Sequence, residues 1–273
     1  MFTLVAGTGY TGRRVLERLP VDEVAGASRS PIETDRTFHL VDFDALDTSA
    51  FDLPARYAIL YTCPPSDADD KRLQRFLDHL SPAPERFVYI STTGVYGDCK
   101  GAVVTEDSPL NPDSRMSRPR VAAETLLTRW AERTSSDLVI LRVPGIYGPG
   151  RLGTERIRDA GAYISNDEAN PGNRIHVDDL ATCCIAALSS KTPAGVYNVG
   201  DGDHRSSTWF ADEVARQAGL PEPRKVSRAQ AEKEFSPARL AFMAASRIVD
   251  TTKMREVLGV TPRTPEDGIR DSL

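Results

Sequence analysis

The sequence FTLVAGTGYTG at residues 2–12 decides the fold of this chain. Its first part, Phe2–Ala6, is an apolar run typical of a short buried strand, and glycines follow it without a spacer. The next residues place Val15, Leu16 and Leu19 at the spacing of one helix face. A strand, a G-x-G-x-x-G turn and a helix in this order predict a loop whose backbone can approach a pyrophosphate.

Each glycine of this loop has a separate expected role. Gly7 makes the tight turn, Gly9 leaves room for the phosphate, and Gly12 lets the helix and the strand pack closely. Amides at the helix N-terminus then face the anion, so Tyr10 and Thr11 are counted with the cofactor-binding loop. The alternative is a glycine-rich turn that is needed only for packing.

Strand-like and helix-like segments alternate through the first part of the chain, which favours a parallel sheet with crossover helices. Further strands are expected near residues 23–27, 38–41, 57–61, 86–90 and 138–141, with helices at about 67–80 and 118–133. Beyond Pro144 the rhythm changes. There we expect strands at 174–177 and 196–199 and helices at 206–219 and 252–258. A further helix is expected after the first of these strands, with Asp178 or Asp179 as its N-terminal cap.

Composition excludes several classes of function. The chain has 273 residues and a net charge of −5, which argues against nucleic acid or an anionic membrane as the main partner. No apolar stretch approaches the roughly 20 residues that cross a bilayer. The first strand begins at Phe2 and leaves no room for a signal peptide, so we expect a cytoplasmic protein. The four cysteines show no metal-ligand spacing, no metal is expected, and the pair Cys183-Cys184 is assigned to packing.

The end of the second strand bears on the choice of dinucleotide. An acidic residue there accepts the ribose hydroxyls of NAD, whereas an arginine suits NADP. Here the sequence is Ala27-Ser28-Arg29-Ser30, without a carboxylate. Ser28 and Arg29 are therefore expected to bind a 2′-phosphate, which favours NADP(H) over NAD(H). The alternative is that Arg29 is a solvated surface side chain.

Several motifs occur in a familiar order along nearly the whole chain. They are VAGTGYTG (5–12), FVYISTTGVYGD (87–98), VAAE (121–124), LRVPGIYGPG (141–150), RIHVDDLA (174–181), VYNVGDG (196–202) and LGVTPR (258–263). The chain resembles the extended, atypical branch of the short-chain dehydrogenase/reductase superfamily, which includes NAD-dependent nucleotide-sugar epimerases and dehydratases. The resemblance implies an α/β fold, a Rossmann-type doubly wound parallel sheet with a smaller C-terminal substrate lobe. The dinucleotide-binding domain would be residues 1–144, with a contribution from about 173–200, and the interleaved substrate lobe residues 145–273.

The resemblance also implies catalytic positions, and the chain departs from the family at one of them. Thr92 stands where the family has its Ser or Thr. The family's Tyr and Lys, four residues apart on one helix face, correspond to Met116 and Arg120. A thioether cannot give or take a proton, so Met116 is not competent as an acid/base. Arg120 retains a positive charge that can bind the cofactor ribose.

Other positions take expected roles from the same resemblance. Thr62 and Cys63, after the fourth strand, and Pro144 and Gly145, after the sixth, would border the cofactor. Tyr96, Tyr147 and His176 would line the substrate pocket. The alternative for His176 is a structural role at the junction of the two lobes, and Asp178 is expected to cap a helix rather than to act in catalysis. Thr93-Gly94 replaces the Asp-Glu pair of the dehydratases, which argues against dehydration.

Three functions remain open from the sequence. The first is an NADP(H)-dependent oxidoreductase or epimerase that acts on a small sugar-like or carbonyl substrate, with a nucleotide sugar as candidate. The second is a non-catalytic NADP(H)-binding sensor, which Met116 favours. The third is a scaffold that has lost the cofactor, which the intact glycines disfavour. We expect a monomer or a homodimer; family dimers pair the helices near residues 67–80 and 118–133.

Overall fold

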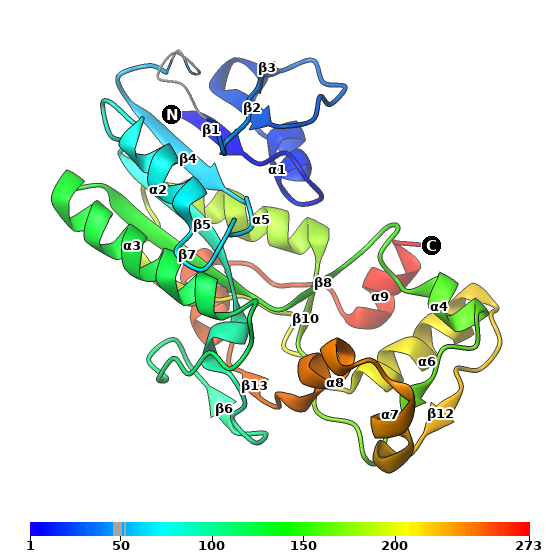
Figure 1. The fold of residues 1–273 in the computed structure, drawn as a ribbon. Helices are drawn as coiled ribbons and strands as arrows, with labels where there is room; N and C mark the ends of the chain where they lie inside the picture. The colour runs from blue at the N-terminus through cyan, green and yellow to red at the C-terminus, as the bar shows by residue number, and fades with distance from the viewer. Residues whose placement is uncertain (46–50, 52) are drawn as a thin grey trace.

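A seven-stranded parallel sheet forms the centre of the molecule (Figure 1). The computed structural model describes residues 1–45, 51 and 53–273. In spatial order the strands are β11 (Gly195–Asn198), β7 (Asp137–Val143), β5 (Arg86–Thr92), β4 (Tyr57–Tyr61), β1 (Phe2–Ala6), β2 (Val24–Ser28) and β3 (Thr37–Leu40). The chain builds outward from β1 to β3 and then from β4 in the opposite direction. The predicted doubly wound Rossmann-type sheet is therefore confirmed, and its switch point lies between β1 and β4.

Helices cover both faces of this sheet. One face packs against α1 (Gly12–Arg18), α5 (Val177–Leu188) and the single wide turn η3 (Met254–Leu258). The other face packs against α2 (Lys71–Asp78) and α3 (Arg118–Thr134). Side chains of β4 alternate between the two cores, and every one of them is buried. A strand buried on both faces reads as a continuous apolar run, which is why β4 was predictable.

The remaining segments build a smaller lobe (Figure 1). It contains short parallel strand pairs and helices: β8 (Gly145–Tyr147) with β10 (Arg174–His176), β9 (Tyr163–Ile164) with β12 (Lys225–Val226), α4 (Thr154–Arg158), α6 (Ser207–Ala218), α7 (Arg228–Glu234), α8 (Pro237–Ala244) and α9 (Pro265–Arg270). Another pair joins β6 (Val103–Val104) to β13 (Ile248–Val249), and two short turns are η1 (Val21–Glu23) and η2 (Thr93–Tyr96). The chain enters the lobe at β8, and the later elements α5 and β11 pack against and extend the central sheet. The central core is therefore completed by residues that follow part of the lobe in sequence. The domain boundaries themselves stay a prediction.

Helix ends follow local chemistry. The Ser206 side chain accepts a hydrogen bond from the Trp209 amide and begins α6, and Gly219 ends it in the left-handed region with φ 63°. Both ends match the prediction. The helix expected from residue 67 begins only at Lys71, because Asp70 adopts φ 46° and caps it by accepting from the Leu73 amide.

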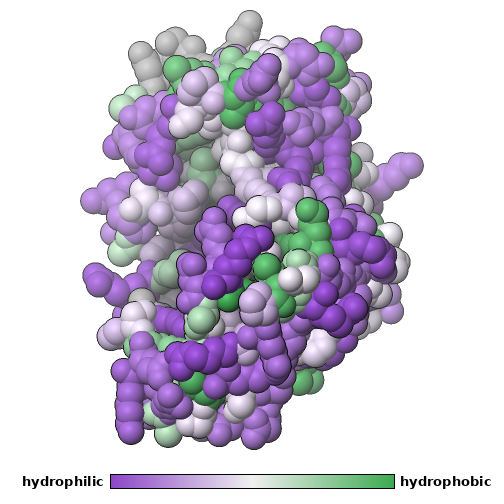
Figure 2. Space-filling model, turned by 90° about the vertical axis from the view of Figure 1, so that its right-hand side faces the viewer, coloured by the Kyte–Doolittle hydropathy of each residue, from purple (hydrophilic) through white to green (hydrophobic). Residues whose placement is uncertain are grey.

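The surface is mainly polar. Figure 2 shows one face on which hydrophilic residues predominate and hydrophobic ones form small groups, with a larger group near the centre of the view. Within residues 1–45, 51 and 53–273, no helix combines the length and apolar character that a membrane span requires.

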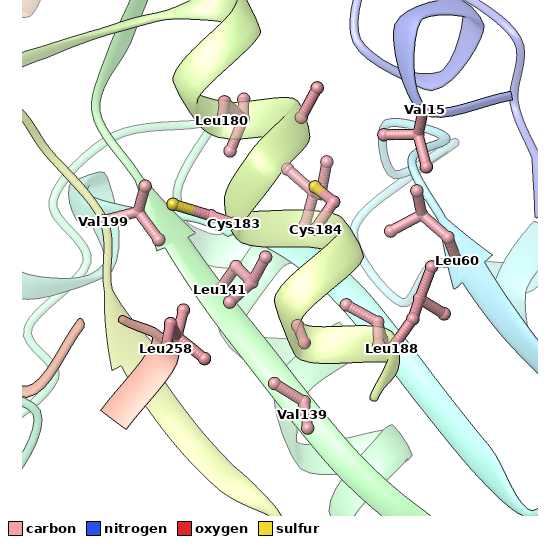
Figure 3. Close-up of a cluster of buried hydrophobic side chains, with 14 of the residues drawn as sticks. Val15, Leu60, Val139, Leu141, Leu180, Cys183, Cys184, Leu188, Val199 and Leu258 are labelled. Carbon is pink, nitrogen blue, oxygen red and sulfur yellow. The ribbon is translucent and has the colours of Figure 1, made fainter. Parts of the chain in front are cut away.

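Two adjacent cysteines of α5 pack into the core between this helix and the sheet (Figure 3). Cys183 and Cys184 are fully buried among the aliphatic side chains of Leu141, Leu180 and their neighbours. Burial raises the pKa of the Cys183 thiol to about 12, so it stays protonated and behaves as a small apolar group. The packing role predicted for this pair is confirmed.

Candidate cofactor groove and catalytic positions

The loop between β1 and α1 has the geometry expected of its three glycines. A side-chain carbon on Gly12 would lie 1.9 Å from the carbonyl oxygen of Gly7, so helix and turn approach too closely for any other residue. Gly7 has φ 97°, and its carbonyl accepts a hydrogen bond of 2.6 Å from the Thr62 hydroxyl. A carbon added to Gly9 would meet no atom within 4 Å. Open space therefore lies beside Gly9, where a phosphate group needs it.

A groove of about 280 Å³ opens beside this loop, at the switch point of the sheet. Predicted cofactor residues on its wall are Gly7, Gly9, Ser28, Arg29, Thr62 and Cys63. The wall also includes Thr8, Ser30, Ile32, Phe43, Pro64 and Arg72, which the sequence did not single out. The structure thus brings together the ends of β1, β2 and β4 in one cavity.

Hydroxyl groups form a chain at the β2 end of the groove. The Thr8 hydroxyl donates to the Ser28 hydroxyl over 2.8 Å, and Ser28 donates to the Ser30 carbonyl over 2.8 Å. These bonds fix Ser28 on the groove wall beside Arg29. The Arg29 side chain is 61% exposed, so it is not held by packing.

A carboxylate also lies at this end of the groove. Asp44 accepts two hydrogen bonds from Arg72, at 2.7 Å from Nε and 2.6 Å from Nη2, and its Oδ2 lies 3.5 Å from Nη1 of Arg29. The Arg72 hydrogen bonds are the main cause that lowers the pKa of Asp44, so the carboxylate is ionised at neutral pH. The sequence lacks an acidic residue after β2, but the segment after β3 supplies one.

Sequence reasoning missed Asp44 and Arg72. The available signal was the position of Asp44 shortly after the strand at 38–41, because neighbouring parallel strands end at the same edge of a sheet. Nothing in the sequence pairs Asp44 with Arg72, which is 28 residues away on α2.

Tyr10 bridges the glycine-rich loop and the segment after β8. Its hydroxyl donates to the Pro149 carbonyl over 3.0 Å, and its ring lies between two guanidinium groups, 4.3 Å from Arg14 and 3.9 Å from Arg151. Neither Tyr10 nor the buried Thr11 is among the residues that line the groove.

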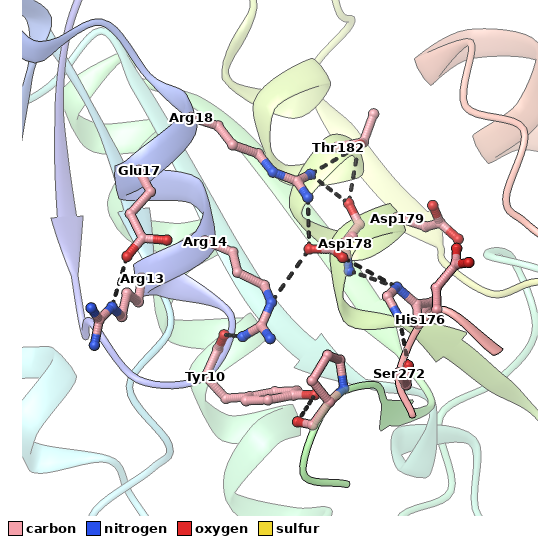
Figure 4. A network of polar contacts seen from close by, with 12 residues as sticks. Tyr10, Arg13, Arg14, Glu17, Arg18, His176, Asp178, Asp179, Thr182 and Ser272 are labelled. Atoms are coloured by element: carbon pink, nitrogen blue, oxygen red, sulfur yellow. Dashed lines mark hydrogen bonds and ion pairs between the residues drawn. The ribbon is translucent and has the colours of Figure 1, made fainter. Parts of the chain in front are cut away.

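Asp178, on the first turn of α5, binds two arginines of α1 (Figure 4). One carboxylate oxygen lies 2.6 Å from Nη2 of Arg18 and 3.3 Å from Nε of Arg14. Arg18 also donates to the Asp178 carbonyl over 2.8 Å. These contacts hold α1, which begins at the glycine-rich loop, against the start of α5.

The cap of α5 is His176, and the prediction that Asp178 or Asp179 caps this helix is wrong. The imidazole Nδ1 accepts a hydrogen bond of 3.1 Å from the Asp178 amide. The proton is therefore on Nε2, which lies 3.0 Å from the Ser272 hydroxyl. Both aspartates instead bind arginines, Asp179 through Arg263. His176 is 1% exposed and burial lowers its pKa, so the ring is a neutral structural group.

The three family catalytic positions lie along the start of α3 and the end of β5. Thr92 is half-buried, and its hydroxyl accepts a hydrogen bond of 3.1 Å from the Gly94 amide. Met116 lies in the turn before α3 and is 81% exposed. Arg120 donates through Nη1 to the Ile90 carbonyl over 2.7 Å. The helix therefore holds Arg120 against β5 at Tyr89 and Ile90, while Met116 faces solvent.

Tyr96 is an interior residue. It is 1% exposed, and its hydroxyl donates to the Asn198 amide oxygen over 2.7 Å and accepts from Arg142 over 2.9 Å. A hydroxyl with both roles filled in this way has no proton free for a substrate. Burial also raises the pKa of Tyr96. Its contacts support a structural role rather than the predicted substrate role.

The segment after β7 combines open and buried positions. Gly145 is exposed and its amide donates to the Asn173 carbonyl over 3.3 Å, while Pro144 before it is half-buried. Tyr147 is buried, and its ring packs edge-on against His176 and Phe210. Its hydroxyl has no hydrogen-bond partner within the described ranges, and burial raises its pKa. Pro144 and Gly145 lie at the carboxyl edge of the sheet, whereas Tyr147 and His176 belong to the lobe's core.

The described residues contain no group of three or more His, Cys, Asp or Glu side chains that could hold a metal ion.

The fold and the glycine-rich loop define a Rossmann-type protein, and comparison with known proteins shows what the chain is similar to. The model of the NAD dependent epimerase/dehydratase family matches residues 72–200. Over these residues the chain is similar to this family, which agrees with the resemblance that its motifs indicate.

Individual relatives are distant. The chain is 34% identical over 140 residues to the uncharacterized protein y4nG of Sinorhizobium fredii, covering 49% of this chain and 35% of that one. It is 28% identical over 190 residues to the UDP-glucose 4-epimerase of Mycolicibacterium smegmatis, covering 65% and 58%. In both comparisons the chain spans less than two thirds of the relative's length. A solved structure of a functionally unknown conserved protein from Silicibacter pomeroyi is 28% identical, with TM-score 0.82 and coverage of 98% and 97%.

Proposed function

We propose that this chain binds NADP(H) in the groove beside Gly9 and transfers hydride to or from a sugar-like or carbonyl substrate. The observation that carries the proposal is the glycine geometry. Gly7 and Gly12 are required by close packing, whereas Gly9 faces open space. A turn needed only for packing has no reason to leave that space. The described residues thus fit a pyrophosphate held by backbone amides at the start of α1.

The phosphorylated cofactor is favoured by the groups at the β2 end. The Arg29 guanidinium offers the planar donors that a phosphomonoester accepts. The Ser28 hydroxyl would add a donor by turning its proton from the Ser30 carbonyl to the phosphate. Arg29 is exposed and loosely paired at 3.5 Å, so it is available to an incoming anion.

The cofactor would supply or accept the hydride, and the chain's own groups would position the reacting carbon. Thr92 can donate its hydroxyl proton to a substrate oxygen, because among the described residues its Oγ1 is used as an acceptor, from the Gly94 amide. The fixed charge of Arg120 beside β5 can bind ribose hydroxyls. Pro144 and Gly145 would border the nicotinamide. The substrate class is a nucleotide sugar, by analogy with the UDP-glucose 4-epimerase relative.

The second candidate is a non-catalytic NADP(H) sensor, and a specific observation favours it. The position of the family's acid/base holds Met116, and two of the other candidate donors are engaged: Tyr96 in its buried hydrogen bonds and His176 as a helix cap. A sensor would bind NADPH and NADP⁺ with different affinities and pass that difference to a partner protein. We place either function in the cytoplasm, in a monomer or a homodimer.

Titration calorimetry with NADP⁺, NADPH and NAD⁺ tests the proposal on the native protein and on Arg29→Asp. We expect NADP⁺ to bind more tightly than NAD⁺, and Arg29→Asp to abolish that preference. Arg56→Asp is the matched control, because it makes the same charge change at the amino end of β4, where Arg56 is 81% exposed. A native protein that binds none of the three nucleotides would refute the proposed function.

A further inference from the structure

Three charged side chains meet near the end of β2: Arg29 and Arg72, which line the groove, and Asp44, which contacts both of them. Arg72 is nearly buried, with 10% of its side chain exposed, whereas Arg29 is 61% and Asp44 41% exposed. Arg72 lines the groove and holds Asp44 through two hydrogen bonds. The cluster therefore has one nearly buried cation, one exposed cation and a carboxylate that contacts both.

The donors of Arg72 are only partly used. A guanidinium has five N–H groups. Three of them donate within the described part of the chain: Nε and Nη2 to Asp44, and Nη1 to the Pro64 carbonyl over 3.2 Å. Two N–H groups remain on a side chain that forms part of the groove wall.

Several hydrogen bonds fix the position of Asp44, although its side chain is partly exposed. The Arg72 fork fixes both carboxylate oxygens, and the Asp44 amide donates to the side chain of Asp42 over 3.0 Å. Arg75 also donates to the Asp44 carbonyl. A preorganised acceptor loses little conformational entropy when a hydroxyl donates to it.

We propose that Asp44 sets the cofactor preference of this groove, by accepting a hydrogen bond from a ribose 2′-hydroxyl and opposing a 2′-phosphate that Arg29 and Arg72 attract. This inference rests on the proposed function, because it requires a dinucleotide in the groove. The segment after β3 thus supplies the acidic group that other Rossmann-type sites place after β2. With two cations and one anion, the groove favours NADP(H) but retains a subsite for NAD(H).

Calorimetric titration of Asp44→Asn with NADP⁺ and NAD⁺ tests this inference. Asparagine keeps the size and one oxygen acceptor but removes the charge. NADP⁺ should bind more tightly, because a carboxylate no longer repels the phosphate, and NAD⁺ more weakly, because a charged acceptor is lost. We expect the ratio of the NAD⁺ to the NADP⁺ dissociation constant to rise at least about tenfold. Adenosine 2′-monophosphate, which carries only the adenosine end, should also bind more tightly.

Asp35→Asn is the matched control, because Asp35 is 71% exposed, lies before β3 rather than after it, and pairs with Arg36 instead of Arg29 and Arg72. It should leave the ratio unchanged. Asp44→Ser repeats the test if Asp44→Asn does not fold. An unchanged or lower ratio in a folded Asp44 variant, with native nucleotide binding intact, overturns the inference alone. A native protein that binds neither nucleotide overturns the proposed function as well.

Discussion

Nη2 of Arg142 lies 2.8 Å from Oε2 of Glu124, and both side chains are only 6% exposed. Arg142 comes from β7 and Glu124 from α3, so the pair joins the sheet to the helix that carries Arg120. Arg142 also donates to the Tyr96 hydroxyl, and Ser91 donates to Glu124. Because both charges are buried, removing one of them would leave the other in the protein interior without a counter-charge, which is strongly destabilising.

The first prediction follows from that pair. Glu124→Gln should lower the free energy of unfolding by about 3–5 kcal/mol, because it leaves the Arg142 charge buried without a counter-charge. Urea unfolding measures the change. Glu213→Gln is the control, since its partner Arg216 is 69% exposed, and it should change stability far less. Equal effects of the two substitutions would contradict the buried-pair interpretation.

Two glycine substitutions should separate folding from nucleotide binding. Gly12→Ala forces a carbon to within 1.9 Å of the Gly7 carbonyl, so the melting temperature should fall. Gly9→Ala adds a carbon to open space, so it should fold normally yet weaken NADP⁺ binding at least about tenfold, by filling the phosphate's position. Thermal unfolding and calorimetry measure the two effects. Unimpaired NADP⁺ binding by Gly9→Ala would place the phosphate elsewhere.

Restoring the family's Tyr and Lys should raise weak carbonyl reductase activity. The double variant Met116→Tyr with Arg120→Lys introduces a phenol whose proton the nearby cation makes easier to transfer. NADPH oxidation with an aldehyde substrate is the measurement. Met116→Phe with Arg120→Lys is the control, because it adds the ring without the hydroxyl. If both double variants have the same activity, position 116 does not face the reacting carbon.

His176 should make stability depend on pH. Its folded pKa is lowered by burial, so below the ordinary histidine value of about 6.5 the unfolded chain binds more protons than the folded one. The stabilisation is present above that value and is lost as the pH falls through the folded pKa. His176→Asn preserves an acceptor for the Asp178 amide without titrating, so its stability should fall less between pH 7.5 and 5.5. Urea unfolding at both pH values tests this, and parallel losses would assign the pH dependence to other groups.

The sequence predicts well those features that depend on neighbouring residues. The strands β4 and β5 are runs of buried side chains, and the ends of α6 are marked by Ser206 and Gly219, which bond or turn within a few residues. The groove's glycines and Arg29 were found for the same reason. Each lies directly after a strand, where local pattern and backbone geometry suffice.

Features that depend on distant partners were not predictable. His176 caps α5 because the helix begins at Val177, which places Asp178 and Asp179 in its first turn, where they bind Arg18 and Arg263. Asp44 lies beside the groove because Arg72, on α2, holds it there. Tyr96 shares a motif with pocket residues, but Arg142 and Asn198 engage it in the interior.

The edge strand β11 has a consequence for synthesis on the ribosome. It pairs with β7 only after the whole stretch from Gly145 to His176 and then α5 have been made, and Leu258 reaches the same core later still. A nascent chain that stops before residue 195 leaves β7 with an unpaired edge and its aliphatic side chains open to water. The nucleotide-binding half is therefore the first part of this chain to be translated but cannot be the first to finish folding.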